Sequence, residues 1–453
     1  MAIKISEYFN TEVCNYASYD NYRKIASIAD GQKPSSRKCL YTVLKNNISS
    51  PIKVAQLKSK TTEQTEYLHG EQSLEGVIVS MAQNFAGSNN VPLFKREGNF
   101  GNRLIPAAAA ARYIFTCKEN YLDALFKKTD EPVLIEQEFE GSIIEPKYYV
   151  PVVPLLAING SIGLTTGFTQ KILQRDVNDV IQYIENKLNG KEKNIKLIPK
   201  FTGFKGTVVP QPDKNEGAWT IRGTYKKISS NEIEITDIPV TYTLEDYTEI
   251  LDKLEEDKMI KEYKDLSDSK TGTFRFSVKF YRNGMGFEPD DDDLLYKLKL
   301  EVDVTENYTS MDENNKIIEC KSIYDVIDHY YDLRLNYYEK RKAWLVKDLT
   351  RRLIENVSRY TFINAVIGGE IVIAKKEDDE IIKQLEKFDK IVKVNDSYDY
   401  LLAMQMRSMT KAHLDKLKEQ LLALKAELLR VREMTTVDMW KEDLDEFKKA
   451  FLK

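Results

Sequence analysis

The segment AAAAARYIFT, residues 107–116, places an arginine directly before a tyrosine whose hydroxyl could act as a nucleophile. A tyrosine hydroxyl has a pKa of about 10, so it attacks as a phenolate only from an electropositive site. Arg112 adjoins Tyr113, and the same part of the chain supplies Arg37, Lys38 and Arg103. An Arg-Tyr pair alone favours a packed ring beside a solvated cation, so the surrounding residues decide the interpretation.

Positive charge is concentrated around this tyrosine, although the chain of 453 residues carries a formal charge of −4. Between Asp20 and Lys118, fourteen Lys and Arg residues stand against seven Asp and Glu residues, a net charge of +7. The balancing acid lies further on, as in Asp290–Asp293, a run whose PDDDD setting is typical of a solvated loop. A basic segment on an acidic body is typical of a protein that binds phosphates with one face. Charge alone also fits an uneven, solvated surface.

The composition argues against several other classes of protein. No apolar run approaches the roughly 20 residues that span a bilayer, and the polar N-terminus has no apolar signal-peptide core. Four scattered cysteines without a CxxC pair argue against a disulfide framework or a zinc site and suit a reducing cytoplasm. With only three histidines, a histidine-based metal centre is not expected either.

The sequence patterns predict that these residues are carried by an α+β protein of several domains. An N-terminal arm (1–20) precedes a basic region of short helices (21–140) and a strand-rich region (141–320). In the latter, KGTVVP, WTIRGTY, EIEITDIPV and TFRFSVKFY alternate apolar and polar residues, as half-buried strands do. Between them, TLEDYTEILDKLEEDKMI has a helical period.

The last region, residues 321–453, predicts two long helices. No Gly or Pro interrupts the chain from Ser322 to about Val366, and Gly368-Gly369 then end the helix. Five leucines from Leu414 to Leu428 follow a 3-4-3-4 spacing, the seam of a coiled coil, with Thr410 as the expected N-cap. These helices should form an antiparallel hairpin, with a small globular knob between them at about residues 368–409.

Six motifs surround Arg112 and Tyr113 in a fixed order. They are DGQKPSSRKCLY (30–41), KVAQL (53–57), YLHGEQSL (67–74), AQNFAGSNN (82–90), GNFGNR (98–103) and NGSIGLTTGF (159–168). Their order and wording resemble the breakage–reunion region of type II DNA topoisomerases, with wording close to the eukaryotic enzymes. The length and the ending resemble the medium subunit of the T4-type bacteriophage topoisomerase. The resemblance runs from about residue 22 to the C-terminus, where WKEDL (440–444) echoes a family signature.

The resemblance implies a catalytic role for four residues. Tyr113 would attack a DNA backbone phosphate and form a 5′-phosphotyrosyl link, which conserves the bond energy so that religation needs no ATP. Arg112 and Arg37 would stabilise the charge that develops at this phosphate. His69 matches the family histidine that hydrogen-bonds near it. Many members carry a second histidine just before this one, where the chain has Leu68.

The family places the tyrosine on a winged-helix domain that docks DNA, followed by a strand-rich tower and a coiled coil that ends in a dimer gate. Leu164 falls at the position of an aliphatic wedge that unstacks a base step and bends DNA. The other expected DNA contacts are amides, hydroxyls and cations that suit phosphates, any one of which also fits an ordinary surface residue. They are Lys33, Lys38, Lys53, Gln56, Gln83, Asn84, Ser88, Asn89 and Arg103.

No phosphate loop of the G-x-x-x-x-G-K-[ST] type is present, nor is the Glu and Asp-x-Asp arrangement that holds magnesium in this family. Mg²⁺ and ATP are therefore expected on a large partner subunit, and no metal site is expected here. The family further implies a homodimer on double-stranded DNA and, by the phage resemblance, the cytoplasm of a bacterial host. With no room for a DNA-wrapping domain after the coiled coil, we expect relaxation and decatenation rather than supercoiling.

Two alternatives belong to other classes. A tyrosine recombinase or nicking protein also makes phosphotyrosyl DNA, but it needs several Arg and His residues before a C-terminal tyrosine, or a His cluster. A non-catalytic, dimeric DNA-architectural protein would have the winged helix, the wedge and the coiled coil without cleavage. Trapping covalent protein–DNA adducts with denaturant separates these alternatives.

Overall fold

The computed structural model describes residues 4–191, 195–211, 214, 216–281, 291–373, 376–405 and 409–452. The chain forms two compact units, one from Met1–Lys128, Leu134–Arg334 and Asp443–Lys453, the other from Thr129–Val133 and Leu335–Glu442. The expected boundary at residues 320/321 coincides with the start of the long helix α11 (Ile323–Ile367), whereas the units divide inside that helix. None of the described helices is long and apolar enough to cross a membrane.

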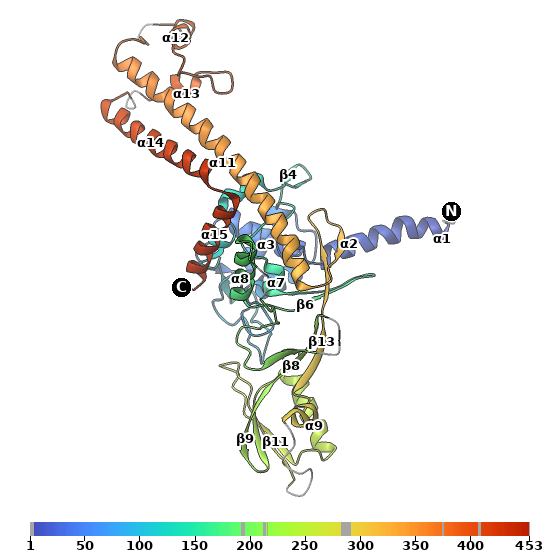
Figure 1. The fold of residues 1–453 in the computed structure, drawn as a ribbon. Coiled ribbons are helices and arrows are strands. Elements are labelled where there is room, and N and C mark those ends of the chain that lie inside the picture. Colours follow the sequence, from blue (N-terminus) through green and yellow to red (C-terminus); the bar gives the residue numbers. More distant parts are fainter. Residues whose placement is uncertain are drawn as a thin grey trace. The chain divides into compact units, whose positions relative to one another are not determined.

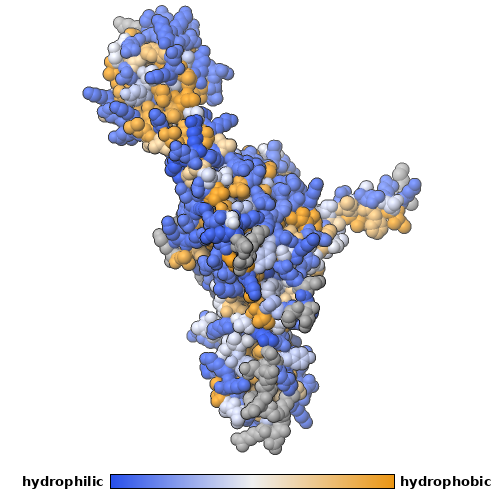
Figure 2. All heavy atoms as spheres, viewed as in Figure 1, coloured by the Kyte–Doolittle hydropathy of each residue, from blue (hydrophilic) through white to orange (hydrophobic). Residues whose placement is uncertain are grey.

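The N-terminal arm is helical and longer than predicted. Helix α1 (Ile5–Tyr8), a π-helical stretch (Phe9–Val13) and helix α2 (Cys14–Lys24) follow one another without a break (Figure 1). Large apolar side chains are exposed along it, at Ile5, Phe9 and Tyr16 among others, and apolar surface runs along one side in Figure 2. The chain becomes buried at Ile25, where α2 has ended.

The next elements form the helical part of the first unit. Helices α3 (Pro34–Lys45), α4 (Val54–Thr65) and α5 (Glu71–Ala82) pack on fully buried side chains such as Leu40, Leu57 and Ile78. Pro34 opens α3, where a missing N–H costs nothing. Strand β1 (Ile52–Lys53) pairs with β2 (Phe115–Thr116), which joins the start of α4 to the segment after Tyr113. Helix α6 (Leu122–Leu125) and a 3₁₀ turn (Lys128–Val133) follow.

A short hairpin, β3 (Glu138–Phe139) with β4 (Ser142–Ile143), leads into a mixed layer. There α7 (Leu155–Asn159) and α8 (Val177–Leu188) accompany a sheet of order β15-β14-β6-β5, formed by Ile317–Glu319, Asn307–Met311, Thr169–Ile172 and Ser161–Leu164. Beside this sheet, Arg175 and Glu306 form a fully buried ion pair of 2.6 Å, and the indole N–H of Trp219 donates to the same carboxylate. This pair joins the layer to the strands that follow.

The strand-rich region contains two further sheets, as the alternating pattern predicted. Strands β7 (Thr207–Pro210), β8 (Ala218–Arg222) and β13 (Glu301–Thr305) pair in the order β13-β8-β7. The second sheet has the order β11-β12-β10-β9, from Glu262–Asp265, Phe276–Lys279, Glu232–Asp237 and Thr224–Ser229. Helices α9 (Leu244–Glu256) and α10 (Asp291–Lys297) pack on its apolar face. We call this four-stranded sheet with its two helices the tower sheet; Figure 1 labels its β9, β11 and α9.

The acidic run was predicted as a solvated loop, and the described part of it is not. Asp290 lies outside the described residues, whereas Asp291–Lys297 form helix α10, in which Asp293 pairs with Lys297 one turn later.

The second unit contains the predicted helical hairpin and knob. Leu424 and Leu428 of α14 (Lys411–Glu433) pack against Leu345–Leu353 of α11. The knob, with α12 (Asp378–Leu385) and α13 (Asp399–Leu402), has its own core, to which Leu417 contributes. Thr410 accepts a hydrogen bond from the His413 N–H, so the predicted N-cap is confirmed.

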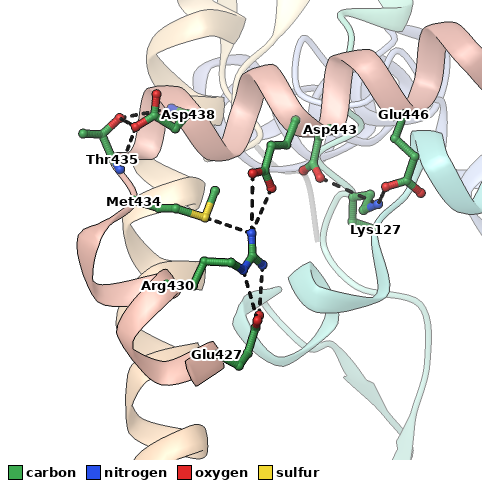
Figure 3. A network of polar contacts seen from close by, with 9 residues as sticks. Lys127, Glu427, Arg430, Met434, Thr435, Asp438, Asp443 and Glu446 are labelled. Atoms are coloured by element: carbon green, nitrogen blue, oxygen red, sulfur yellow. Dashed lines mark hydrogen bonds and ion pairs between the residues drawn. The ribbon is translucent and has the colours of Figure 1, made fainter. Parts of the chain in front are cut away.

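A sharp corner joins α14 to α15 (Thr436–Phe451). Arg430 at the end of α14 donates to Glu427 at 2.9 Å and to Glu442 at 3.2 Å, and it also contacts the Met434 sulfur (Figure 3). Thr435 and Asp438 exchange capping hydrogen bonds at the start of α15. These polar contacts define where the coiled-coil helix ends.

Candidate functional site

Tyr113 is presented to solvent from a fixed backbone. Its side chain is 64% exposed, and its N–H donates to Ala110 O at 2.9 Å, which closes a tight turn. The guanidinium carbon of Arg112 lies 4.7 Å from the centre of the Tyr113 ring. The turn is tied to the start of α4, because the Val54 N–H donates to Ile114 O and the Ala55 N–H donates to Ala111 O. The phenol is thus exposed while its backbone is held on both sides.

Two predicted phosphate contacts lie at the same corner. Lys53 pairs with Phe115 in the β1–β2 ladder, and its N–H donates to the side chain of Gln56 at 3.2 Å. Both side chains are exposed. The structure therefore brings Lys53, Gln56, Arg112 and Tyr113 together around one turn and one helix start.

His69 and Lys38 line a cavity of about 220 Å³ between the end of α2 and the loop before α5. Arg23 lines it as well, and no motif in the sequence had singled out this arginine. Its guanidinium lies 5.6 Å from the ring of Tyr19, another lining residue. Two carboxylates, Glu66 and Glu145, line the same cavity, so its cations do not stand alone.

The surroundings of His69 favour the neutral form of its ring. Its Nε2 lies 3.0 Å from the Tyr19 hydroxyl, and its ring packs edge-on against Tyr67. The pKa of His69 is lowered from its ordinary value, first by partial burial and then by the positive charges of Arg23 and Lys38. A neutral imidazole can donate one hydrogen bond and accept another, which suits a residue that orients a phosphate without adding charge.

Lys38 is partly neutralised. Its ammonium donates to Thr65 O at 2.6 Å and to the buried carboxylate of Glu145 at 2.9 Å. Burial raises the pKa of Glu145, and Lys38 acts against that shift. Lys38 is thus bound within the protein, whereas Arg23 is exposed and can contact a phosphate group.

The hairpin β5–β6 exposes Leu164, the residue that the family resemblance predicts as the wedge. Leu164 is 72% exposed at the end of β5, and Ile162 on the same face of the strand is 68% exposed. The Lys33 ammonium donates to Ile162 O at 2.7 Å, and Asp20 accepts from the Thr166 N–H at 3.0 Å. Lys33, expected at a phosphate, therefore holds the backbone of the strand that carries the wedge.

Arg37 has a different place from the one predicted. It is buried, and its Nε and Nη2 atoms donate to both carboxylate oxygens of Asp30 at 2.7 and 3.1 Å. The same carboxylate accepts the Tyr149 N–H at 3.0 Å. A cation enclosed in this way does not reach a phosphate, so we correct its role from transition-state stabilisation to positioning of the loop before α3.

The substitution Arg37→Leu should lower the free energy of unfolding by roughly 3–5 kcal/mol, because it leaves the Asp30 carboxylate buried without its counter-charge. Denaturant unfolding of the purified chain measures this loss. Arg23→Leu is the matched control, since it removes an exposed arginine near the same loop. Equal stability of the two variants would contradict the positioning role.

Four more predicted contacts are engaged within the protein. Gln83 donates to Phe100 O and Pro106 O, and Asn89 donates to Ser80 O and Gln83 O. The Ser88 hydroxyl donates to Phe85 O. Arg103 is paired with Asp237 and is therefore not free for DNA, which corrects the prediction for this residue.

Asn84 remains exposed, at the edge of a second cavity of about 210 Å³ that Arg103 and Asp237 also line.

Arg23 is a candidate site residue that was not singled out from the sequence. Arg23 precedes Asp30 of the D-G-x-K-P motif by seven residues and belongs to the same basic segment. Without a fold, it was indistinguishable from its neighbour Lys24, which instead pairs with Asp20 at 2.8 Å. Among the described residues, no group of three or more His, Cys, Asp or Glu side chains is placed to hold a metal ion.

Comparison with known proteins places the whole chain in one context. Residues 23–445 match the family model described as the A subunit of DNA gyrase/topoisomerase IV. The chain is 33% identical over 456 residues to the mitochondrial DNA topoisomerase 2 of Dictyostelium discoideum, covering 98% of this chain and 35% of that protein. It is 30% identical over 485 residues to DNA topoisomerase 2 of Penicillium chrysogenum, covering 98% of this chain and 30% of that protein.

A solved structure agrees with these relatives. It is the DNA-binding, cleavage and re-ligation domain of Plasmodium falciparum topoisomerase II, with a TM-score of 0.88 and 30% identity, covering 98% of this chain and 64% of that one. The match confirms the predicted fold class. The chain spans about a third of the length of the two curated relatives, both of them eukaryotic enzymes rather than phage subunits.

Proposed function

The chain belongs to the type II DNA topoisomerase family, and we propose that it is the part of such an enzyme that cleaves and rejoins DNA. The observation that carries this proposal is the exposed Tyr113 on a backbone-locked turn, with Arg112 against its ring. A packed structural tyrosine would be buried. A solvent-facing phenol beside a cation suits attack on a large anionic substrate.

The proposed reaction is a reversible transesterification. The Tyr113 oxygen, having lost its proton, bonds to a backbone phosphorus, and the bond from that phosphorus to the 3′ oxygen breaks. The 3′ oxygen takes up a proton and leaves as a hydroxyl, so the 5′ phosphate stays on the tyrosine. The reverse attack by that hydroxyl rejoins the strand, and no bond energy is lost. Arg112, against the ring of Tyr113, stabilises the added negative charge. The family resemblance implies that His69 hydrogen-bonds near the same phosphate.

We further propose that the substrate is double-stranded DNA cut by a homodimer, because a double-strand break needs one tyrosine for each strand. The passage of a second duplex through the break would relax or decatenate DNA. The knob of the second unit, with its own core, is the surface on which we place the contact between the two copies.

Mg²⁺ and ATP are the cofactors that the family implies, and the described residues offer no group that fits the metal. We propose that both bind to a partner subunit with ATPase and metal-binding domains, as the resemblance to the phage medium subunit suggests. In that organisation the enzyme would act in the cytoplasm of a bacterial host.

The test is to trap the covalent intermediate. Supercoiled DNA is incubated with the chain, Mg²⁺ and the candidate partner, and the reaction is stopped with denaturant. We expect protein attached to the 5′ ends of linear DNA. Attachment to a 3′ end would favour a tyrosine recombinase, and DNA binding without any attachment would favour an architectural protein.

The proposed wedge gives a separate prediction. Leu164→Ala should weaken DNA bending and slow cleavage, because unstacking a base step costs a few kcal/mol that the aliphatic contact offsets. Energy transfer between dyes at the two ends of a duplex measures the bend. Ile228→Ala is the control, since Ile228 is an aliphatic residue of the tower sheet that is also exposed. An unchanged bend would move the role to Ile162.

A further inference from the structure

The loop of residues 99–106, which we call the latch loop, ends seven residues before Tyr113 and is gripped by the tower sheet. Three consecutive side chains make the contact: Asn102, Arg103 and Leu104. None of them is explained by binding DNA at the turn of Tyr113, because all three are engaged within the protein. The polar partners of Asn102 and Arg103 lie more than 130 residues further along the chain.

Leu104 is part of the core of the tower sheet. It is 4% exposed and belongs to the same buried cluster as Ile233, Ile235, Phe276 and Leu298. A single leucine from the helical part of the unit thus completes a core that is otherwise made by the strand-rich region. Withdrawal of the latch loop would open a hole in that core, which makes the contact costly to break.

Two polar groups and two aromatic rings contact the Arg103 guanidinium. Its guanidinium donates to the carboxylate of Asp237 and to Ile238 O at the end of β10. The rings of Phe204 and Phe274 lie 5.3 and 4.9 Å from its guanidinium carbon. The side chain of Asp237 is 5% exposed, so removing Arg103 would leave a buried carboxylate without its counter-charge.

Asn102 completes the grip. Its side chain donates to Ser269 O at 2.7 Å, in the loop between β11 and β12, while its oxygen accepts the N–H groups of Leu104 and Ile105. Gly272 of the tower loop has a φ of +67°, and a Cβ there would lie 3.0 Å from the Asn102 side chain. The loop between β11 and β12 therefore approaches Asn102 at a distance that requires glycine at position 272.

The other side of the latch loop is fastened to the segment of Tyr113. The Ala109 N–H donates to Asn99 O at 2.9 Å, and Gln83 donates to the carbonyls of Phe100 and Pro106. Just before the loop, Glu97 exchanges two backbone hydrogen bonds with Phe115, two residues beyond the nucleophile. Displacement of the latch loop would therefore displace the backbone of Tyr113.

Next to this contact lies the second cavity, of about 210 Å³, bounded by Asn84 on one side and by Lys205 and Thr271 on the other. Beside the cavity, Ala86 lies in a buried cluster against which Val240, just after β10, also packs. The helical part and the tower sheet therefore meet at the latch loop and also through this cluster. A movement of the tower sheet would be transmitted to the latch loop through Asn102, Arg103 and Leu104.

We propose that Arg103 is a positioning residue through which the placement of the tower sheet, set by bent DNA, controls the presentation of Tyr113. The inference rests on the proposed function for its chemical consequence. The mechanical coupling itself depends only on the contacts of the latch loop. Cleavage would then be favoured on DNA that has already been bent, and a straight duplex would meet a poorly placed tyrosine.

The first experiment tests the coupling without any chemistry. Hydrogen–deuterium exchange of residues 106–116 is compared between the full chain and the variant Arg103→Gln. We expect exchange about tenfold faster in the variant, the effect of losing a charge-assisted hydrogen bond that holds a segment closed. Arg275→Gln is the matched control, because Arg275 makes an exposed ion pair with Glu234 on the same sheet. Equal exchange in all three proteins would overturn the coupling.

The second experiment tests the consequence. Adduct formation by the chain with its partner subunit is timed on a duplex with flexible pyrimidine–purine steps at its centre and on one with a stiff A-tract. The unmodified chain should cut the flexible duplex faster. Arg103→Gln should cut it about tenfold more slowly, and its preference between the duplexes should be lost, because the placement of the nucleophile no longer follows the bend.

The outcomes separate the two proposals. An unmodified chain that forms no adduct fails the proposed function, while the exchange measurement still decides the coupling. A variant slowed equally on both duplexes would show a merely structural arginine and would overturn the coupling. Arg103→Lys keeps a charge opposite Asp237 and should recover part of the preference, which guards against misfolding of the glutamine variant.

Discussion

Replacing Tyr113 with phenylalanine should abolish strand cleavage and leave DNA affinity within about twofold, because the hydroxyl alone is chemically required. The side chain is exposed, so the variant should also unfold at the same temperature. Denaturant-trapped adduct measures cleavage, and a mobility shift measures binding. We expect no adduct above background at any protein concentration.

A second variant separates the loss of the nucleophile from a change in the turn. Arg112→Ala keeps the phenol but removes the cation against its ring, and should slow cleavage on the order of 10²-fold if that cation stabilises the transition state. Adduct formed by the phenylalanine variant would refute the assignment of Tyr113. Three exposed tyrosines of the arm, Tyr8, Tyr16 and Tyr19, would then be the next candidates.

The purified chain by itself should neither hydrolyse ATP nor relax supercoiled DNA. Phosphoryl transfer of this kind uses a divalent cation to polarise the phosphate, and the described residues contain no group of three ligands for one. Both activities should return when a subunit with metal-binding and ATPase domains is added. Relaxation of supercoiled plasmid and phosphate release, measured with and without that subunit, test this division of labour.

The acidic run provides the control for this prediction. If the chain carried its own metal site, Asp290–Asp293 would be the candidate, and neutralising those aspartates to asparagine should stop cleavage. We expect almost no effect on cleavage, because Asp293 already pairs with Lys297 within α10. Strong magnesium-dependent cleavage by the chain alone would overturn the division of labour, though not the role of Tyr113.

Much of the fold could be predicted because local pattern and tertiary structure agree. The uninterrupted stretch from Ser322 became α11, the leucine seam became α14, and the alternating segments became strands. In each case the apolar residues recur with the period of a helix or a strand, so they lie on one face of the element, and that face is buried in a core. The π-helical stretch in the arm, by contrast, has no such pattern and was not predicted.

The cations were harder to predict, for an electrostatic reason. A basic residue in a basic segment suits a phosphate and an internal carboxylate equally well, and the sequence does not say which it meets. Asp237, the partner of Arg103, lies 134 residues away along the chain, so no local pattern pointed to it. Arg37 pairs with Asp30 only seven residues earlier, inside the motif that suggested a phosphate contact. In both cases the buried carboxylate, once the chain has folded, takes the cation before any DNA arrives.

The insertion of Leu104 bears on how this chain could be divided or recombined. A fragment ending near residue 140 would expose this leucine, and the tower sheet expressed without residues 99–106 would fold around a gap. Neither piece would be a self-sufficient module. A graft that exchanged the tower sheet between relatives would have to include the latch loop. It would therefore also replace the segment that leads to Tyr113. Evolution of the two parts should therefore be correlated, and lineages that alter one should show compensating changes in the other.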